Sequence, residues 1–264
     1  MHRELVTFTI FGKSITLYSY GLLMSLALIF GIFVFYKLAE KKGLRASRIF
    51  DNIVLVILVG LAGARIGYVL VHLDYYTRYP LDALKIWQGG LTFYGAFFGG
   101  LLMVVIWFLR EERKNLWKWL DCAIPALALG NGIGKIGCFL NGCCYGREAN
   151  LPWAIKIPVL EDNIARHPVQ IYEALAYILV FVILILVGRL KYKYKFNGFV
   201  FFLGLILHSL ARFGLEYYRE WIITVRLANI EFSDAQVICS IIIICAIIGL
   251  VWRKNIWTKR LSKN

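Results

Sequence analysis

Charge is scarce in this sequence. Only 17% of its 264 residues are charged, whereas 60% are hydrophobic. A water-soluble domain of this length needs more polar surface than that to cover its core. The composition therefore excludes an ordinary soluble domain and indicates a protein whose solvent is lipid.

Several other features are missing as well. Residues 1–17 show no small-residue cleavage site behind a basic start, so we expect no cleavable signal peptide. The sequence has no linker, no low-complexity segment and no second copy of a glycine-broken span, which counts against a transporter built from repeats. We expect a single integral membrane domain over residues 1–264, with an extended or interfacial lead-in at 1–17, a transmembrane bundle at 18–252 and a basic cytoplasmic tail at 253–264.

Long apolar runs are what the sequence does have. Runs of about 20 residues are long enough to cross a bilayer as helices. We identify them at 18–36, 52–72, 91–109, 120–140, 169–187, 198–217 and 235–252. Glycines and a lysine interrupt the fourth run, so the number of spans could also be six or eight. The predicted fold class is an all-α polytopic membrane protein of about seven transmembrane helices.

Basic residues are concentrated in alternate loops. Of the 30 lysines and arginines, 18 follow the first, third, fifth and seventh runs, and nine lie in the opposite loops and the N-terminal segment. The positive-inside rule then places the N-terminus outside and the C-terminus in the cytoplasm, which fits an odd number of spans. Basic loops beside anionic lipid headgroups explain the net charge of +14 without nucleic acid as a partner.

Three basic residues remain inside apolar runs, namely Arg65, Lys135 and Arg212. A charge near the bilayer centre costs about 2.5–3.5 kcal/mol, so such residues usually have a function, although snorkelling to the interface is the alternative. Because the three come from different runs, we predict that they converge on one anion. Glu216 and Arg219 share a helix face with Arg212, so Glu216 is expected to hold Arg212 while Arg219 points to the outer headgroup region.

The segment around Lys135 reads GNGIGKIGCFLNGCCYGR and contains six glycines. Glycines in a membrane helix permit either close approach of another backbone or a broken helix that lines a cavity and offers N–H groups to phosphate. The spacing of Cys138, Cys143 and Cys144 fits no usual zinc pattern. We favour inert packing over metal or redox chemistry for them, and we expect no metal, no cofactor and no disulfide framework.

Two further segments are more polar than lipid tolerates. GGLTFYGAFFGG enters the third run with Tyr94, and HPVQIYEAL opens the fifth with His167, Gln170 and Glu173. Near a helix start, His167 and Glu173 suit capping or the helix dipole. Capping and catalysis stay open for His167.

Taken in order, these motifs resemble the prolipoprotein diacylglyceryl transferases of bacterial inner membranes. The resemblance runs from about residue 10 to residue 221. The matching blocks are SYGLL with Tyr20, GARIGYV with Arg65, GGLTFYGAFFGG, Asp121, KIGCFLNGCCYGR, HPVQIYE and LARFGLEYYRE.

The resemblance implies a reaction and its partners. The family transfers the diacylglyceryl group of phosphatidylglycerol to the lipobox cysteine thiol of a preprolipoprotein and leaves glycerol phosphate. Such a reaction needs a basic site that stabilises the departing phosphate and a means of deprotonating the thiol. We therefore expect a multi-pass enzyme of the bacterial inner membrane that is monomeric and whose partners are phosphatidylglycerol, preprolipoprotein signal peptides and membrane lipids.

The resemblance also assigns residues. The resemblance implies Arg212 as a catalytic residue and places Lys135 and Tyr94 at catalytic positions of the family's motifs, and we add His208 as a catalytic candidate of our own. The implied substrate-binding residues are Tyr20, Arg65, Asn141, Gly142, Gly146, His167, Gln170, Glu173, Glu216 and Arg219.

The chain departs from the family at several signature positions. Members commonly have histidine, arginine, asparagine and an acidic residue where this chain has Tyr94, Lys135, Cys138 and Cys143. Lysine keeps the charge but loses bidentate phosphate geometry. We hypothesise that His208, one turn before Arg212, supplies the missing imidazole.

Two other classes of function stay open. A divergent paralogue would transfer a lipid-derived group to another acceptor, and product analysis would reveal it. A non-catalytic anionic-lipid-binding or transport protein would bind lipid without turnover.

Overall fold

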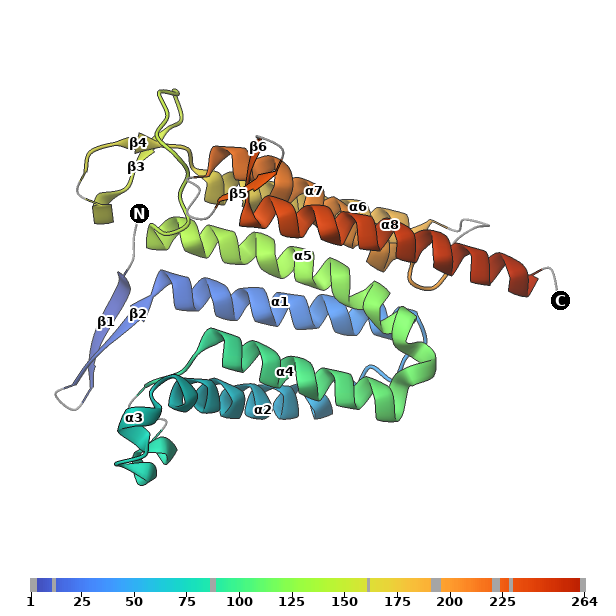
Figure 1. The fold of residues 1–264 in the computed structure, drawn as a ribbon, viewed down its shortest axis with the longest axis horizontal. Helices are drawn as coiled ribbons and strands as arrows, with labels where there is room; N and C mark the ends of the chain where they lie inside the picture. The colour runs from blue at the N-terminus through green and yellow to red at the C-terminus, as the bar shows by residue number, and fades with distance from the viewer. Residues whose placement is uncertain are drawn as a thin grey trace. The chain divides into compact units, whose positions relative to one another are not determined.

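The computed structural model describes residues 4–10, 13–85, 89–160, 162–190, 196–219, 224–227 and 230–261 (Figure 1). The chain forms two compact units, which are described separately. The larger comprises Met1–Leu38 and Trp117–Asn264, and the smaller comprises Ala39–Leu116. Within the described residues, six helices are long and apolar enough to cross a membrane, and a seventh apolar helix is shorter. The predicted class of an all-α polytopic membrane protein is confirmed.

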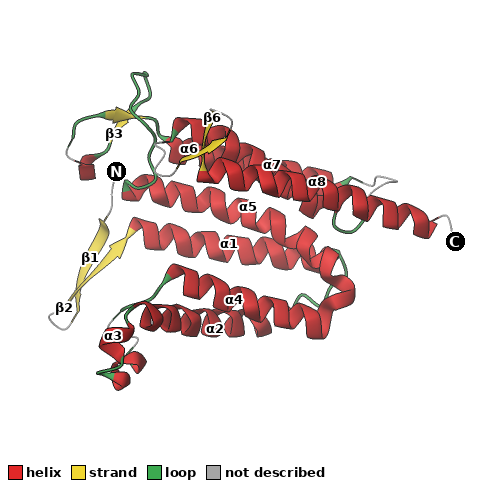
Figure 2. Ribbon diagram, viewed as in Figure 1, coloured by secondary structure: helices red, strands yellow, loops and turns green. Residues whose placement is uncertain are grey.

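The larger unit contains five long helices and three short antiparallel strand pairs. The helices are α1 (Ser19–Lys41), α5 (Leu116–Asn141), α6 (Val169–Arg189), α7 (Phe199–Leu215) and α8 (Asp234–Leu261). The strands are β1 (Glu4–Ile10), β2 (Lys13–Tyr18), β3 (Ile155–Lys156), β4 (Ala165–Arg166), β5 (Thr224–Leu227) and β6 (Ile230–Ser233). They pair as β1–β2, β3–β4 and β5–β6, and Figure 2 shows them at one end of these helices. Single turns of 3-10 helix lie at Pro158–Leu160 and Glu216–Tyr218.

Helix α5 packs closely because its glycines leave room for neighbouring backbones. A side chain at Gly132 would approach the carbonyl oxygen of Ala174 on α6 to 3.3 Å, and one at Gly137 would meet Leu23 on α1 at 3.3 Å. The helix is continuous from Leu116 to Asn141. These glycines therefore allow neighbouring helices to approach α5 closely. The alternative prediction of a broken helix is wrong.

A buried carboxylate connects α5 to the start of α7. Asp121 is 4% exposed. Its two oxygens accept hydrogen bonds from the backbone N–H groups of Gly198 and Phe201 at 3.0 and 2.9 Å. These N–H groups at the start of a helix have no partner within it, and the helix dipole favours a negative charge there. Asp121 thus caps the start of α7.

The smaller unit consists of α2 (Arg48–Val71), α3 (Leu73–Tyr76), a 3-10 helix at Pro80–Leu84 and α4 (Phe93–Trp107), followed by a π-helical turn (Phe108–Glu112) and a 3-10 turn (Arg113–Asn115). Helices α2 and α4 meet through glycines on both sides. A side chain at Gly99 would lie 2.6 Å from the carbonyl oxygen of Val59, which no real side chain tolerates. Small residues allow this contact in a membrane, where packing rather than the hydrophobic effect drives helix association.

Each of the seven expected spans overlaps one described α-helix of at least 15 residues. The largest difference is in the third run, where α4 has 15 residues and the π-helical turn follows it. At the C-terminus α8 continues to Leu261, through most of the expected basic tail. The N-terminal lead-in forms the hairpin of β1 and β2. The orientation of the termini stays a prediction.

Candidate functional site

The buried carboxylate of Glu173 is the centre of a charged cluster in the larger unit. Glu173 lies on α6 and is 0% exposed. Its Oε2 lies 2.6 Å from Nζ of Lys135 on α5, and its Oε1 lies 2.5 Å from Nη1 of Arg212 on α7. Arg219 contributes a longer contact, 3.5 Å from its Nη1 to Oε1. Three helices and the segment after α7 are therefore joined at one carboxylate.

A second carboxylate completes the cluster. Glu216 Oε2 lies 2.9 Å from Nη2 of Arg212 and 3.8 Å from Nε of Arg219. The Arg212–Glu216 pair is the one that the i,i+4 spacing predicted. We call Lys135, Glu173, Arg212, Glu216 and Arg219 the charge cluster. Three cations face two carboxylates, so the cluster carries one formal positive charge, and each cation keeps 20–24% of its side chain exposed.

The signature segment after Lys135 ends α5 in a specific turn. The N–H of Gly142 donates to the carbonyl of Phe139 at 3.2 Å, and the N–H of Cys143 donates to the carbonyl of Cys138 at 3.1 Å. This pair of bonds is the Schellman motif, which needs a left-handed residue after the helix, and Gly142 has φ 73°. Gly142, expected to bind substrate, thus stops the helix, and Asn141 is the last helical residue.

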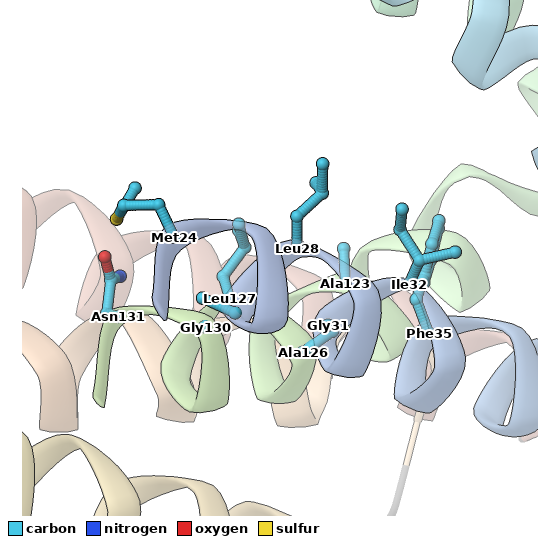
Figure 3. A pocket seen from close by; sticks show the side chains of 11 residues that line it. Met24, Leu28, Gly31, Ile32, Phe35, Ala123, Ala126, Leu127, Gly130 and Asn131 are labelled. Atoms are coloured by element: carbon cyan, nitrogen blue, oxygen red, sulfur yellow. The ribbon is translucent and has the colours of Figure 1, made fainter. Parts of the chain in front are cut away.

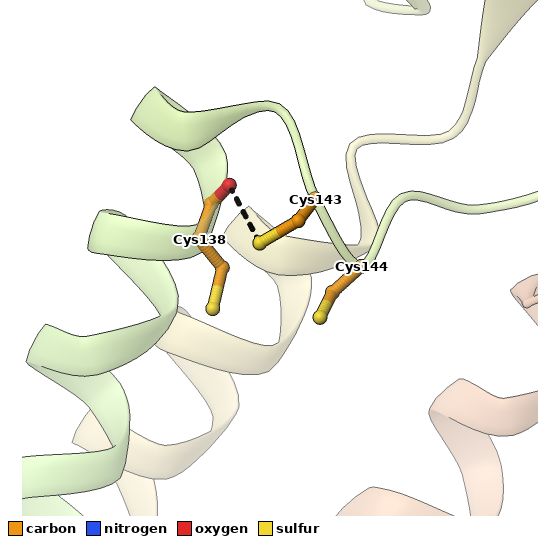
Figure 4. Close-up of side chains that lie close together, drawn as sticks. All are labelled: Cys138, Cys143 and Cys144. Carbon is orange, nitrogen blue, oxygen red and sulfur yellow. Dashed lines mark hydrogen bonds between the residues drawn. The ribbon is translucent and has the colours of Figure 1, made fainter. Parts of the chain in front are cut away.

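The Schellman turn folds two cysteines back onto the end of α5. Cys143 Sγ lies 3.7 Å from the Cys138 carbonyl oxygen, and the sulfurs of Cys138, Cys143 and Cys144 all lie within 4.8 Å of one another (Figure 4). A hydrogen bond from the Cys138 thiol, reinforced by Lys135 and Arg219, lowers the pKa of the Cys144 thiol below its ordinary value. All six cysteines of the chain are free thiols.

The HPVQIYE segment lies beside this turn. Gln170 is fully buried, and its Nε2 donates to the carbonyl of Cys143 at 2.7 Å. His167 precedes α6. The N-cap residue of this helix is Pro168, which makes no side-chain capping hydrogen bond. Instead the His167 ring packs beside Tyr172 and Tyr218, with centroids 6.1 and 5.1 Å away. These three rings help to line a cavity of about 560 Å³.

Gly146 lies where two chain segments cross. Its N–H donates to the carbonyl of His167 at 3.0 Å. A side chain at this position would come within 2.5 Å of the Tyr218 carbonyl oxygen and of Val169 Cγ2. Gly146 is therefore needed for close backbone approach, and its expected role in substrate binding stays a prediction.

An apolar pocket of about 380 Å³ lies along α1 and α5 (Figure 3). Met24 and Leu28 line it from α1, and Leu127 and Asn131 line it from α5, where Asn131 is its polar member. Tyr20 lies near the first turn of α1, with its ring against Gly137.

His208 lies one turn before Arg212, as expected, but it is stacked on another ring. Its imidazole lies parallel to the phenol of Tyr177, with centroids 4.3 Å apart. It lines a small cavity of about 130 Å³ together with Ala128 and Val180. The hypothesis that His208 acts as a base stays a prediction.

Arg65 belongs to the smaller unit and has partners of a different kind. Its guanidinium donates to the carbonyl oxygens of Asp82, Ala83, Gly89 and Gly90 at 2.6–3.0 Å. The arginine is 7% exposed. Tyr94 is the second residue of α4, and its side chain lies outside the described residues. Of the three intramembrane cations, Lys135 and Arg212 meet at Glu173.

Residues 6–252 match the sequence profile of the family described as Prolipoprotein diacylglyceryl transferase. The chain belongs to this family. A phosphatidylglycerol–prolipoprotein diacylglyceryl transferase of Finegoldia magna is 38% identical over 80% of this chain and 82% of its own length. Proteins of the same name from Clostridium tetani and Campylobacter lari are 32% and 34% identical over 81% and 82% of the chain, and over 84% and 81% of their own lengths. The resemblance found in the motifs is confirmed.

The sequence of this member of the diacylglyceryl transferase family did not predict the role of Glu173. Glu173 was considered for capping or substrate contact, yet it is the shared counter-ion of Lys135 and Arg212. The signal was present, because an acidic residue near an apolar run is as costly as a basic one and calls for an opposite charge. The spacing within one helix predicted Glu216, but no spacing rule connects α6 to α5 and α7.

Proposed function

We propose that this chain transfers the diacylglyceryl group of phosphatidylglycerol to the cysteine thiol of a prolipoprotein. The charge cluster is the observation that supports this function best. It joins two cations at one buried carboxylate, has a third cation beside them and carries an excess positive charge. A phosphodiester that binds there would replace carboxylates as the partner of the cations. Those carboxylates already hold the cations in position.

The chemistry follows from where charge develops. The thiolate sulfur attacks the glyceryl carbon, the carbon–oxygen bond to phosphate breaks, and negative charge grows on the departing phosphate. Arg212 presents a planar fork that suits two phosphate oxygens, and Lys135 contributes a point charge. Donors fixed in advance stabilise the transition state more than water does, because they need no reorganisation during the reaction.

The surroundings support a lipid substrate and a membrane location. The apolar pocket along α1 and α5 suits hydrocarbon. We place the protein in the bacterial inner membrane as a monomer, with the charge cluster towards the outer face, where a prolipoprotein signal peptide would present its cysteine.

The decisive experiment is a transfer assay with purified full-length protein, phosphatidylglycerol and a lipobox peptide. Mass spectrometry should show the peptide gaining a diacylglyceryl group. We expect Arg212→Ala to slow the transfer by about 10²–10³-fold, the range seen when one charge-stabilising donor is removed. The matched control is Arg189→Ala, an exposed arginine at the other end of α6 from Glu173, which should transfer at the wild-type rate.

Other outcomes would contradict the proposal in different ways. Consumption of phosphatidylglycerol without a change in peptide mass would indicate another acceptor and hence a paralogous activity. Phosphatidylglycerol that stays bound and intact would indicate a lipid-binding protein without turnover.

A further inference from the structure

The sulfurs of Cys138, Cys143 and Cys144, which we call the thiol cluster, are closer together than inert packing requires. All three lie within 4.8 Å of one another, and none is fully buried (Figure 4). The backbone enforces this proximity, because the Schellman turn at Gly142 returns Cys143 to the last turn of α5. Cys144, whose φ is 59°, is held in a left-handed conformation that few residues other than glycine adopt.

These distances fit a metal ion. Zinc–sulfur bonds of about 2.3 Å in a tetrahedral site place two sulfurs about 3.8 Å apart, so the thiols need to approach by at most about 1 Å to share an ion. Lys135 lies one turn before Cys138 on the same helix. Three thiolates around a divalent ion leave one negative charge, and this lysine would offset it.

The number of ligands indicates what kind of metal site this is. The described histidine, cysteine and acidic side chains that lie close enough together to share an ion are these three cysteines. Structural zinc sites are closed by four protein ligands, whereas three protein ligands leave a fourth position open to water or substrate.

We propose that the thiol cluster binds a thiophilic divalent ion of the zinc class and that the ion's open position takes the acceptor thiol. The second half of this proposal rests on the proposed function. The acceptor thiol would displace a water ligand and release its proton to solvent, because a metal-bound thiol is deprotonated. Its sulfur would then form the bond to the glyceryl carbon while glycerol phosphate leaves with the carbon–oxygen electron pair. The thioether product is a weak ligand, and water would replace it.

Metal binding is tested on the reduced, detergent-purified full-length protein. We expect one zinc ion per chain, measured by elemental analysis and by competition with a chromophoric chelator. Each of Cys138→Ser, Cys143→Ser and Cys144→Ser should weaken zinc binding by more than about tenfold, because each removes one of three ligands. Cys245→Ser, an exposed cysteine on α8, is the matched control and should bind zinc like the wild type. Absence of stoichiometric zinc, or serine variants that bind as well as the wild type, would overturn the proposal.

The open position is tested without relying on turnover. With cobalt in place of zinc, a lipobox peptide should increase the thiolate-to-cobalt charge-transfer absorption, and the same peptide with serine for cysteine should not. An unchanged spectrum would overturn the acceptor half and leave the metal site in place. Metal binding with the spectral change but no diacylglyceryl transfer would support this inference and refute the proposed function. Full transfer by metal-free protein would refute the acceptor half alone.

Discussion

Arg65 and Arg212 both lie on helices that could span a membrane, yet the two are stabilised by different partners. Arg65 donates to four backbone carbonyl oxygens, which are neutral, and it lies near the rings of Tyr68 and Tyr76. Arg212 pairs with the carboxylates of Glu173 and Glu216. Backbone carbonyl groups hold an arginine where it is, so Arg65 connects Asp82 and Ala83 to Gly89 and Gly90. Carboxylate partners can give way to another anion, which is why we propose the charge cluster as the site for the phosphate.

The largest effect should come from removing the shared carboxylate. Glu173→Gln keeps the shape of the side chain but removes the carboxylate that Lys135, Arg212 and Arg219 share. Breaking a buried ion pair by removing one partner costs about 3–5 kcal/mol, so this variant should unfold at a much lower temperature and lose transfer activity. Glu216→Gln is the comparison, and it should cost less because Glu216 pairs with the two arginines, whereas Glu173 pairs with all three cations. Equal thermal stability of Glu173→Gln and the wild type would contradict this view of the charge cluster.

Much of the fold could be predicted from the sequence, because lipid imposes a simple rule. A helix that crosses a bilayer needs an apolar run of fixed length, and all seven runs contain a helix. The length of α4 was missed, since hydropathy does not reveal where a π-helical turn takes over. The Arg212–Glu216 pair was predicted because its i,i+4 spacing brings the two side chains together even where α7 ends and the 3-10 turn begins.

The site was less predictable, because its geometry depends on contacts between elements. The role of Glu173 required knowing that α5, α6 and α7 meet at one point. The thiol cluster was interpreted as inert packing from the spacing of its cysteines, but the turn at Gly142 brings Cys143 back over Cys138. Arg65 had the same sequence signature as Lys135, an isolated charge in an apolar run, and only its carbonyl partners distinguish it.

A second test addresses the other side of the comparison. Arg65→Lys keeps the charge but loses the planar fork that reaches four carbonyl groups. Hydrogen bonds to charged groups contribute about 1.5–3 kcal/mol each, and lysine can remake some of them, so we expect a loss of about 2–3 kcal/mol in thermal or denaturant unfolding. Arg78→Lys, at an exposed position of the same unit, should change little. Loss of transfer without loss of stability would instead make Arg65 part of the substrate site.

A third test uses two neighbouring glycines that present carbonyl groups to Arg65. Gly89 and Gly90 have φ values of 87° and 74°, so alanine at either position is strained by about 1–2 kcal/mol. Among the described residues, the new methyl group at Gly90 would meet Arg65 Nη1 and Tyr68 Cε1, each at 2.7 Å, whereas one at Gly89 would meet nothing within 4 Å. Gly90→Ala should therefore unfold more easily than Gly89→Ala. Equal stability of the two variants would show that the Arg65 contacts contribute little.

The smallest effect should come from Asp82, whose carbonyl oxygen accepts from Arg65 while its side chain faces Lys85 and Tyr75. Lys85 Nζ lies 2.6 Å from Oδ1, and the Tyr75 hydroxyl donates to Oδ2 at 2.8 Å. The hydrogen bond from Lys85, followed by that from Tyr75, lowers the pKa of the Asp82 carboxyl below its ordinary value of 3.8, and the carboxylate in turn raises the pKa of Tyr75. A lowered pKa in the folded state means that the ionised carboxylate stabilises the fold at neutral pH, and that this contribution disappears as the pH falls through the folded-state pKa.

Asp82→Asn should therefore lower the melting temperature slightly at pH 7 and not at all in strong acid, where the wild type has lost the same interaction. The effect should be smaller than that of Arg65→Lys, because exposed ion pairs contribute little and the backbone carbonyl that Arg65 uses is unchanged. Melting curves of both proteins across the acid range would measure it. A loss as large as that of Arg65→Lys would mean that Arg65 is held through the Asp82 side chain, and the distinction between an arginine bound by carbonyl groups and one bound by carboxylates would fail.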